Sequence, residues 1–166
     1  MSVTTVRGAD IEDLISAYPA DLRYALAILQ DLQQRYNYIP REALTVVAGH
    51  IGCSEAHLYA MATFYKALSL KPKGRHIIKV CDGTACHLHG SLNLVGAVQR
   101  ELGIKPGETT ADGMFSLETV NCLGSCAIAP VLVVGETFHG QVTPEKLPQI
   151  IAQYTDHAAR EGEVTV

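Results

Sequence analysis

The sequence lacks the features that mark membrane-spanning, secreted and nucleic-acid-binding proteins. Its 166 residues contain no apolar run close to the ~20 residues that a membrane-spanning helix requires. The N-terminal residues lack the apolar core of a signal peptide. The net charge is −4, so the chain has no basic excess with which to bind phosphates. We therefore expect a cytoplasmic protein with no nucleic-acid partner and no direct insertion into a membrane.

Nucleotide-binding motifs are missing as well. No Gly-x-Gly-x-x-Gly follows a predicted strand, and there is no Walker-type loop that would surround a phosphate. We identify no catalytic residues and no complete substrate site in this chain. Any chemistry on a nucleotide is therefore expected to take place in another protein.

The first part of the chain has the apolar periodicity of helices. Hydrophobic residues make up 48% of the sequence, which is enough for a packed core. Four helices are expected: a short one through about Ala17, one from Asp21 that ends before Pro40, one from Pro40 that Gly52 ends, and one with Ser54 as candidate N-cap. We expect residues 1–72 to form a helical bundle. The apolar positions of its longest predicted helix recur at helical spacing: Leu22, Leu26, Leu29, Leu32 and Tyr36.

The pattern changes at a polar turn, Lys71–Gly74, which we take as a domain boundary. Residues 73–155 are expected to form an α/β domain with the order β-α-β-β-β-α, followed by a polar tail over residues 156–166. The expected elements are a strand over 76–80, a helix over 88–102, a strand over 114–120, a hairpin over 131–139 and a helix over 143–154.

Four of the five cysteines form two pairs, each directly after a predicted strand. The pairs are Cys81-x4-Cys86 and Cys122-x3-Cys126, with 35 residues between them. Thiols stay reduced in the cytoplasm, so metal ligation or redox chemistry is favoured over disulfides. Both loops contain glycine and free backbone N–H groups, which stabilise the negative charge of thiolates and sulfides. A [2Fe–2S] cluster is the interpretation that the loops favour.

The spacing by itself leaves other interpretations open. A structural zinc site with four cysteine ligands uses similar intervals, so zinc is not excluded. A thioredoxin-type dithiol normally requires Cys-x-x-Cys, which is absent here. Four unrelated buried cysteines are a third alternative.

Motifs around these loops resemble a known family. They are Tyr38–Leu44, Ala62–Tyr65, Val80–Cys86, and Cys122–Cys126 followed by Ala129-Pro130. Over about residues 20–155 the chain resembles the thioredoxin-like [2Fe–2S] subunit of NADH dehydrogenase, the respiratory complex I. The same module occurs in NAD-linked [FeFe] and [NiFe] hydrogenases, some of them electron-bifurcating, and in NAD-dependent formate dehydrogenases.

The resemblance implies the fold, the cofactor and the partners. The fold would be α/β, with an N-terminal helical bundle followed by a thioredoxin-like domain that has a small mixed sheet. Cys81, Cys86, Cys122 and Cys126 would hold one [2Fe–2S] cluster for one-electron transfer. The chain would be a subunit of an NAD(P)H-linked multisubunit oxidoreductase, in the cytoplasm or peripheral to a membrane complex.

The expected partner is a flavoprotein subunit that binds FMN, NAD(P) and a [4Fe–4S] cluster, together with further iron–sulfur subunits. None of these groups is expected in this chain. The alternatives are a free-standing thioredoxin-like ferredoxin, which would not need the helical bundle, and a zinc-stabilised assembly module.

Five further side chains allow two interpretations each. Cys53 is either a reactive thiol or a small core residue, and we favour the core. Phe64 and Tyr65 are either a subunit contact or bundle core, and helical spacing predicts that at least one is core. His87 and His89 are either ligands of a Rieske-type centre or surface residues, of which His87 would tune the reduction potential. We favour the surface interpretation because four cysteines already complete the site.

Overall fold

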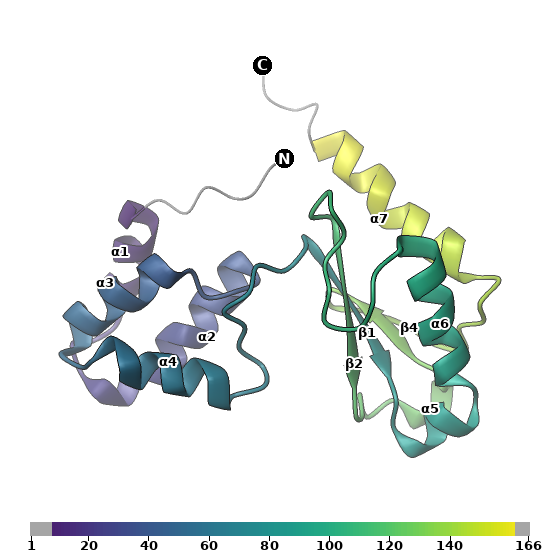
Figure 1. Ribbon diagram of the computed structural model, residues 1–166, viewed down its shortest axis with the longest axis horizontal. Helices are drawn as coiled ribbons and strands as arrows, with labels where there is room; N and C mark the ends of the chain where they lie inside the picture. The colour runs from purple at the N-terminus through teal and green to yellow at the C-terminus, as the bar shows by residue number, and fades with distance from the viewer. Residues whose placement is uncertain (1–7, 162–166) are drawn as a thin grey trace. The chain divides into compact units, whose positions relative to one another are not determined.

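The computed structural model describes residues 8–161 and divides into two compact units between Lys73 and Gly74. The first unit contains helices alone among its described residues, and the second contains a sheet and helices (Figure 1). The α/β class, with a helical region ahead of a small sheet, is therefore confirmed.

The first unit is built from four α-helices and one 3-10 turn. The helix ends follow the capping signals in the sequence. The Ser54 Oγ accepts a hydrogen bond from the His57 N–H at 3.3 Å, as an N-cap does, and Gly52 ends the preceding helix with a φ of 71°. The elements are α1 (Gly8–Ser16), η1 (Leu22–Tyr24), α2 (Ala25–Tyr36), α3 (Arg41–Ile51) and α4 (Glu55–Phe64).

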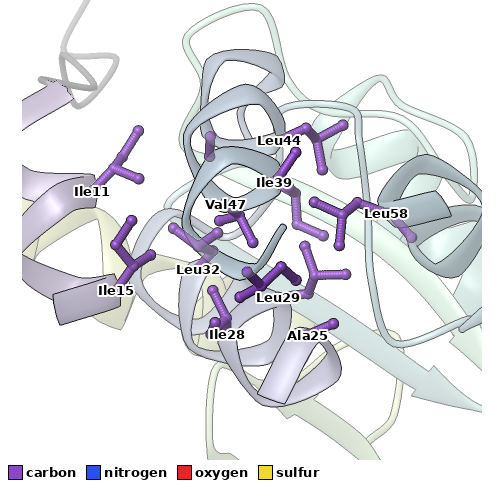
Figure 2. Close-up of a cluster of buried hydrophobic side chains, with 14 of the residues drawn as sticks. Ile11, Ile15, Ala25, Ile28, Leu29, Leu32, Ile39, Leu44, Val47 and Leu58 are labelled. Atoms are coloured by element: carbon purple, nitrogen blue, oxygen red, sulfur yellow. The ribbon is translucent and has the colours of Figure 1, made fainter. Parts of the chain in front are cut away.

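The core of the first unit lies between α1, α2, α3 and α4 (Figure 2). Ile28, Leu29 and Leu32 of α2 are fully buried, as are Val47 of α3 and Leu58 of α4. The predicted helix began too early, because the residues before Ala25 form the 3-10 turn instead. Leu22 is consequently 49% exposed, and the buried stripe begins inside α2.

The prediction that Phe64 or Tyr65 belongs to the bundle core is wrong. Phe64 is 80% exposed and Tyr65 is 40% exposed, and their rings meet edge to face with centroids 5.2 Å apart. The physical reason is that α4 buries Leu58 and Ala62, one helical turn apart, whereas Phe64 is the last residue of the helix on another face. The two rings therefore form an exposed aromatic pair.

The second unit contains a four-stranded mixed sheet. Its strand order is β2-β1-β3-β4, with β1 parallel to β2 and antiparallel to β3, and β3 antiparallel to β4. Gly135 and Glu136 form the predicted two-residue hairpin turn. The elements are β1 (His76–Cys81), α5 (Thr84–Leu88), α6 (Ser91–Leu102), β2 (Phe115–Val120), η2 (Cys126–Ile128), β3 (Leu132–Val134), β4 (Thr137–His139) and α7 (Leu147–Glu161).

Two helices of this unit differ from their predicted bounds. The helix predicted over 88–102 begins at Ser91, because Gly90 adopts a φ of 87° and separates it from the one-turn helix α5. The helix α7 begins at Leu147 and continues past Tyr154 to Glu161, into the region predicted as a tail. Residues 162–166 of that predicted tail lie outside the described residues.

The two faces of the sheet have different neighbours. Side chains alternate along a strand, so Ile78 and Val80 of β1 lie on one face and Cys81 lies on the other. The first face packs against α6 and α7 in a continuous core. Cys81 instead clusters with Val131 and Val133. The candidate site is therefore placed at the end of β1, away from the helix-covered face.

None of the helices within residues 8–161 has the combination of length and apolar character needed to cross a membrane.

Helix α4 offers a matched pair of substitutions that tests this packing. We expect Leu58→Ala to lower the free energy of unfolding by about 2–5 kcal/mol, because it leaves a cavity in the bundle core. Phe64→Ala on the same helix should change it by no more than about 0.5 kcal/mol, because that ring is exposed. Urea denaturation followed by circular dichroism measures both values. Equal losses in the two variants would contradict the packing of α4 described here.

Candidate metal centre

The parallel pairing of β1 and β2 brings the two cysteine pairs to one edge of the sheet. Cys81 ends β1 and pairs with Val120, the last residue of β2, and Cys122 follows two residues later. The Asp82 N–H donates to the Val120 carbonyl at 2.8 Å, so the two segments remain hydrogen-bonded just past the end of β1. Segments that lie far apart in the sequence thus deliver cysteines to the same place.

The first pair is buried. Cys81 is 3% exposed and Cys86 is 2% exposed, and the two thiols lie close enough for each to shift the pKa of the other. The one-turn helix α5 returns the chain so that these sulfurs meet. The Cys81 N–H also donates to the Val131 carbonyl at 3.0 Å, which links the site to the segment ahead of β3.

Backbone N–H groups lower the pKa of the buried thiols, against the effect of burial. Burial raises the pKa of Cys81, but the N–H groups of Gly83 and Leu123 and the thiol of Cys86 outweigh it, so the pKa lies below its ordinary value. Burial and the neighbouring Cys81 raise the pKa of Cys86, although the Val131 N–H opposes that shift. The surroundings of Cys81 therefore stabilise negative charge on its sulfur.

The second pair is exposed. Cys122 and Cys126 both face solvent, and the Gly124 N–H lies 3.3 Å from the Cys122 sulfur. Gly124 has a φ of 77°, in the left-handed region of backbone conformation that favours glycine. Cys126 lies close enough to Cys86 for its charge to raise the pKa of that thiol. Each loop thus approaches the other through its cysteines.

Gly83 allows the two cysteine loops to touch. A Cβ atom at this position would lie 2.7 Å from the carbonyl oxygen of Asn121 and 3.6 Å from the Cα of Cys122. The first distance is too short for any side chain, and the atom it meets belongs to the backbone. The closeness of the loops therefore depends on glycine at position 83.

The second loop is anchored by residues that the sequence did not point to. A Cβ on Gly140 would lie 2.6 Å from the Cβ of Ile128, and the Gln141 N–H donates to the Ile128 carbonyl at 2.8 Å. The Ala129–Pro130 peptide bond is cis. No signal in the sequence links Gly140 to Cys126, since only the folded hairpin brings the two segments together.

A carboxylate beside Cys81 organises the first loop. The Asp82 Oδ1 accepts a hydrogen bond from the Ser91 Oγ at 2.8 Å and lies 3.0 Å from the His87 Nδ1. Hydrogen bonds from His87 and then from Ser91 lower the pKa of Asp82. His87 and His89 are exposed, as the surface interpretation expected. The sequence drew attention to His87, but it carried no signal for the buried Ser91.

Cys53 belongs to the first unit, whereas the other four cysteines belong to the second. Its side chain is half-buried against the bundle core, and burial raises its pKa. A raised pKa makes a thiol less nucleophilic at neutral pH. The interpretation as a small packing residue is therefore the better one.

The donor set fits a two-iron cluster. Among the described residues, no three histidine, cysteine or acidic side chains gather closely enough to hold a metal ion, so the fit is judged from how the cysteines are paired. A [2Fe–2S] cluster with four cysteine ligands takes two thiolates at each iron, so its ligands come in pairs. The cysteines here come in two pairs, with N–H donors at the sulfurs and a glycine where the loops meet.

Comparison with protein families gives a match over most of the chain. The family model described as thioredoxin-like [2Fe-2S] ferredoxin matches residues 11–155. This range includes most of the described helical unit, the sheet and all five cysteines.

Two curated relatives cover nearly the same span. The chain is 36% identical over 145 residues to the NADP-reducing hydrogenase subunit HndA of Solidesulfovibrio fructosivorans, and the match covers 87% of this chain and 85% of the relative. It is 33% identical over 144 residues to a subunit of the NADH-quinone oxidoreductase of Escherichia coli strain K12, and that match covers 87% of each chain.

A solved structure shares the fold. An NAD+-reducing [NiFe]-hydrogenase in its air-oxidized state matches with a TM-score of 0.67 and 21% sequence identity. The match covers 78% of this chain and 23% of that one, so this chain spans less than a quarter of its neighbour.

The contact between the cysteine loops can be tested at Gly83. We expect Gly83→Ala to lower the free energy of unfolding by about 1–3 kcal/mol, because the added Cβ would overlap the Asn121 carbonyl. Gly96→Ala is a matched control in α6, where the added Cβ meets only the flexible end of Arg100 at 3.4 Å. Denaturant unfolding of the two variants measures the difference. A Gly83→Ala protein as stable as the control would show that the loops do not need this approach.

Proposed function

Because the chain belongs to the thioredoxin-like [2Fe–2S] ferredoxin family, as its motifs predicted, we propose that Cys81, Cys86, Cys122 and Cys126 hold one [2Fe–2S] cluster. The observation that supports this most directly is the convergence of two cysteine pairs at one sheet edge, with backbone N–H groups directed at their sulfurs. The bound cluster accepts and releases one electron at a time.

The buried and the exposed cysteine pairs of this site have different roles. Cys81 and Cys86 hold their side of the site away from water, where the N–H groups of Gly83, Leu123 and Val131 stabilise negative charge more strongly. Cys122 and Cys126 face solvent. Cys122 and Cys126 would hold the bound cluster on the side where a redox partner can approach most closely, so electron exchange would be expected there.

The chain works as an electron-transferring subunit of an NAD(P)H-linked multisubunit oxidoreductase. Relatives over nearly its full length are named as subunits of an NADP-reducing hydrogenase and of an NADH-quinone oxidoreductase. The chain lacks nucleotide-binding motifs, so a flavoprotein subunit carries FMN, NAD(P) and a [4Fe–4S] cluster beside it. Further iron–sulfur subunits complete the assembly, which is cytoplasmic or peripheral to a membrane complex.

In this proposal the two domains of the chain have different roles. Residues 1–72 dock the chain in its complex, and residues 73–155 carry the cluster. Residues 156–166 form the C-terminal tail. The exposed aromatic pair of Phe64 and Tyr65 supports a docking role, since large exposed rings are typical of protein contacts. A free-standing ferredoxin would need no such docking unit.

The cofactor assignment is tested by composition. The chain purified without oxygen should contain about two irons and two acid-labile sulfides, and it should give a half-integer-spin EPR signal after reduction. Cys126→Ser should lower the iron and sulfide content, whereas Cys53→Ser should leave it unchanged because Cys53 lies in the other unit. Stoichiometric zinc without sulfide would contradict the cluster and favour the assembly module.

The partner is tested by purifying the tagged chain from its own cells. We expect a flavoprotein to accompany it in constant ratio, with FMN fluorescence in the fraction after denaturation. Phe64→Ala should lower the amount of bound flavoprotein, while a tagged chain with Glu101→Gln, an exposed change in the other unit, should retain it. A chain that carries its cluster but purifies alone would support the free-standing ferredoxin instead.

A further inference from the structure

A buried hydroxyl holds one carboxylate in place beside the first cysteine. Ser91 is the first residue of α6 and has no exposed surface, and its Oγ donates to the Asp82 Oδ1 at 2.8 Å. Buried hydroxyls in folded proteins almost always have such a partner. The hydrogen bond joins the start of α6 to the residue that follows Cys81.

The same carboxylate is held from two other directions. The Asp82 Oδ1 lies 3.0 Å from the His87 Nδ1, and His87 directly follows Cys86. The Asp82 N–H donates to the Val120 carbonyl at 2.8 Å, which fixes its backbone to the end of β2. The side chain of Asp82, which is 37% exposed, and its backbone are therefore both restrained next to Cys81.

A fixed negative charge near a redox centre changes how easily that centre takes up an electron. The added electron is negative, so a neighbouring carboxylate disfavours the reduced form and lowers the reduction potential. A mobile, hydrated carboxylate has a weaker effect, because water screens it. Restraint by Ser91 thus increases the influence of the charge at position 82.

Resting on the [2Fe–2S] site proposed above, we propose that Asp82 is a positioning and potential-lowering residue, whose charge is held beside the buried pair of cluster ligands by the hydroxyl of Ser91. Asp82 contacts neither a substrate nor a reacting atom. Its function is to set the equilibrium for a one-electron step in which no bond forms or breaks.

The test is a reduction-potential titration of the full chain, followed by EPR at pH 8, where ordinary histidine side chains are neutral. Dithionite supplies one electron per cluster. Asp82→Asn keeps the size of the side chain and an oxygen for Ser91 but removes the charge. This variant should raise the equilibrium constant for one-electron reduction about tenfold, which corresponds to a reduction potential about 59 mV higher.

Three variants isolate the cause. Asp82→Glu keeps the negative charge, so its reduction potential should lie close to that of the wild type. Ser91→Ala keeps the charge of Asp82 but removes the hydrogen bond that holds it. It should raise the equilibrium constant for reduction by a smaller factor, about threefold. Glu101→Gln removes an exposed carboxylate at the other end of α6, about 15 Å along the helix, and should leave the potential unchanged.

The outcomes separate this inference from the proposed function. A wild-type chain without iron and sulfide would overturn the cluster site itself. A wild-type chain with its cluster, and the same potential in Asp82→Asn, would overturn the role of Asp82 alone. If Asp82→Asn does not retain the cluster, Asp82→Ser provides the neutral side chain for the same comparison. A Ser91→Ala potential equal to that of the wild type would overturn the holding role of Ser91.

Discussion

The parallel pairing of β1 with β2 is the constraint on which the rest of the site depends. Parallel strands end at the same edge of a sheet, so Cys81 and Cys122 arrive together although 40 residues separate them in the chain. A parallel pair needs a crossover, and here α5 and α6 supply it. The same crossover returns Cys86 to Cys81 and places Ser91 beside Asp82. One topological feature thus assembles the sulfur donors and the carboxylate next to them.

One cysteine pair of the site is buried and the other is exposed to solvent. The buried pair of cysteines is surrounded by Val131, Val133 and backbone N–H groups, an environment of low polarity in which each hydrogen bond to sulfur is strengthened. The exposed pair faces solvent, although Leu123 of the same loop packs against the buried cluster. This asymmetry suits an electron carrier, because the buried side holds the cofactor while the exposed side remains within reach of a partner.

Close packing helps to hold the cysteine loops in place. The five cysteines form no disulfide, and the loops are positioned by backbone hydrogen bonds and by two glycines at points of contact. Gly83 admits the Asn121 carbonyl, and Gly140 admits the Ile128 side chain. Each contact leaves no space for a side chain. The loops therefore keep their spacing through steric fit, and a side chain added at either glycine is expected to displace the cysteine sulfurs.

Much of this protein was determined by the sequence itself, because local signals have local causes. The capping residue Ser54, the short β-branched strands and the turn at Gly135-Glu136 were all predicted from propensity and periodicity. The spacing of the cysteines and their surrounding motifs also predicted the family. Helix periodicity failed at Leu22 and at Phe64, where a 3-10 turn and a helix end interrupt the pattern. Only the tertiary structure decided which cysteine pair is buried, why Gly83 and Gly140 are glycine, and that Ser91 holds Asp82. These depend on contacts between segments distant in sequence, and no local pattern encodes which distant backbone will meet a given residue.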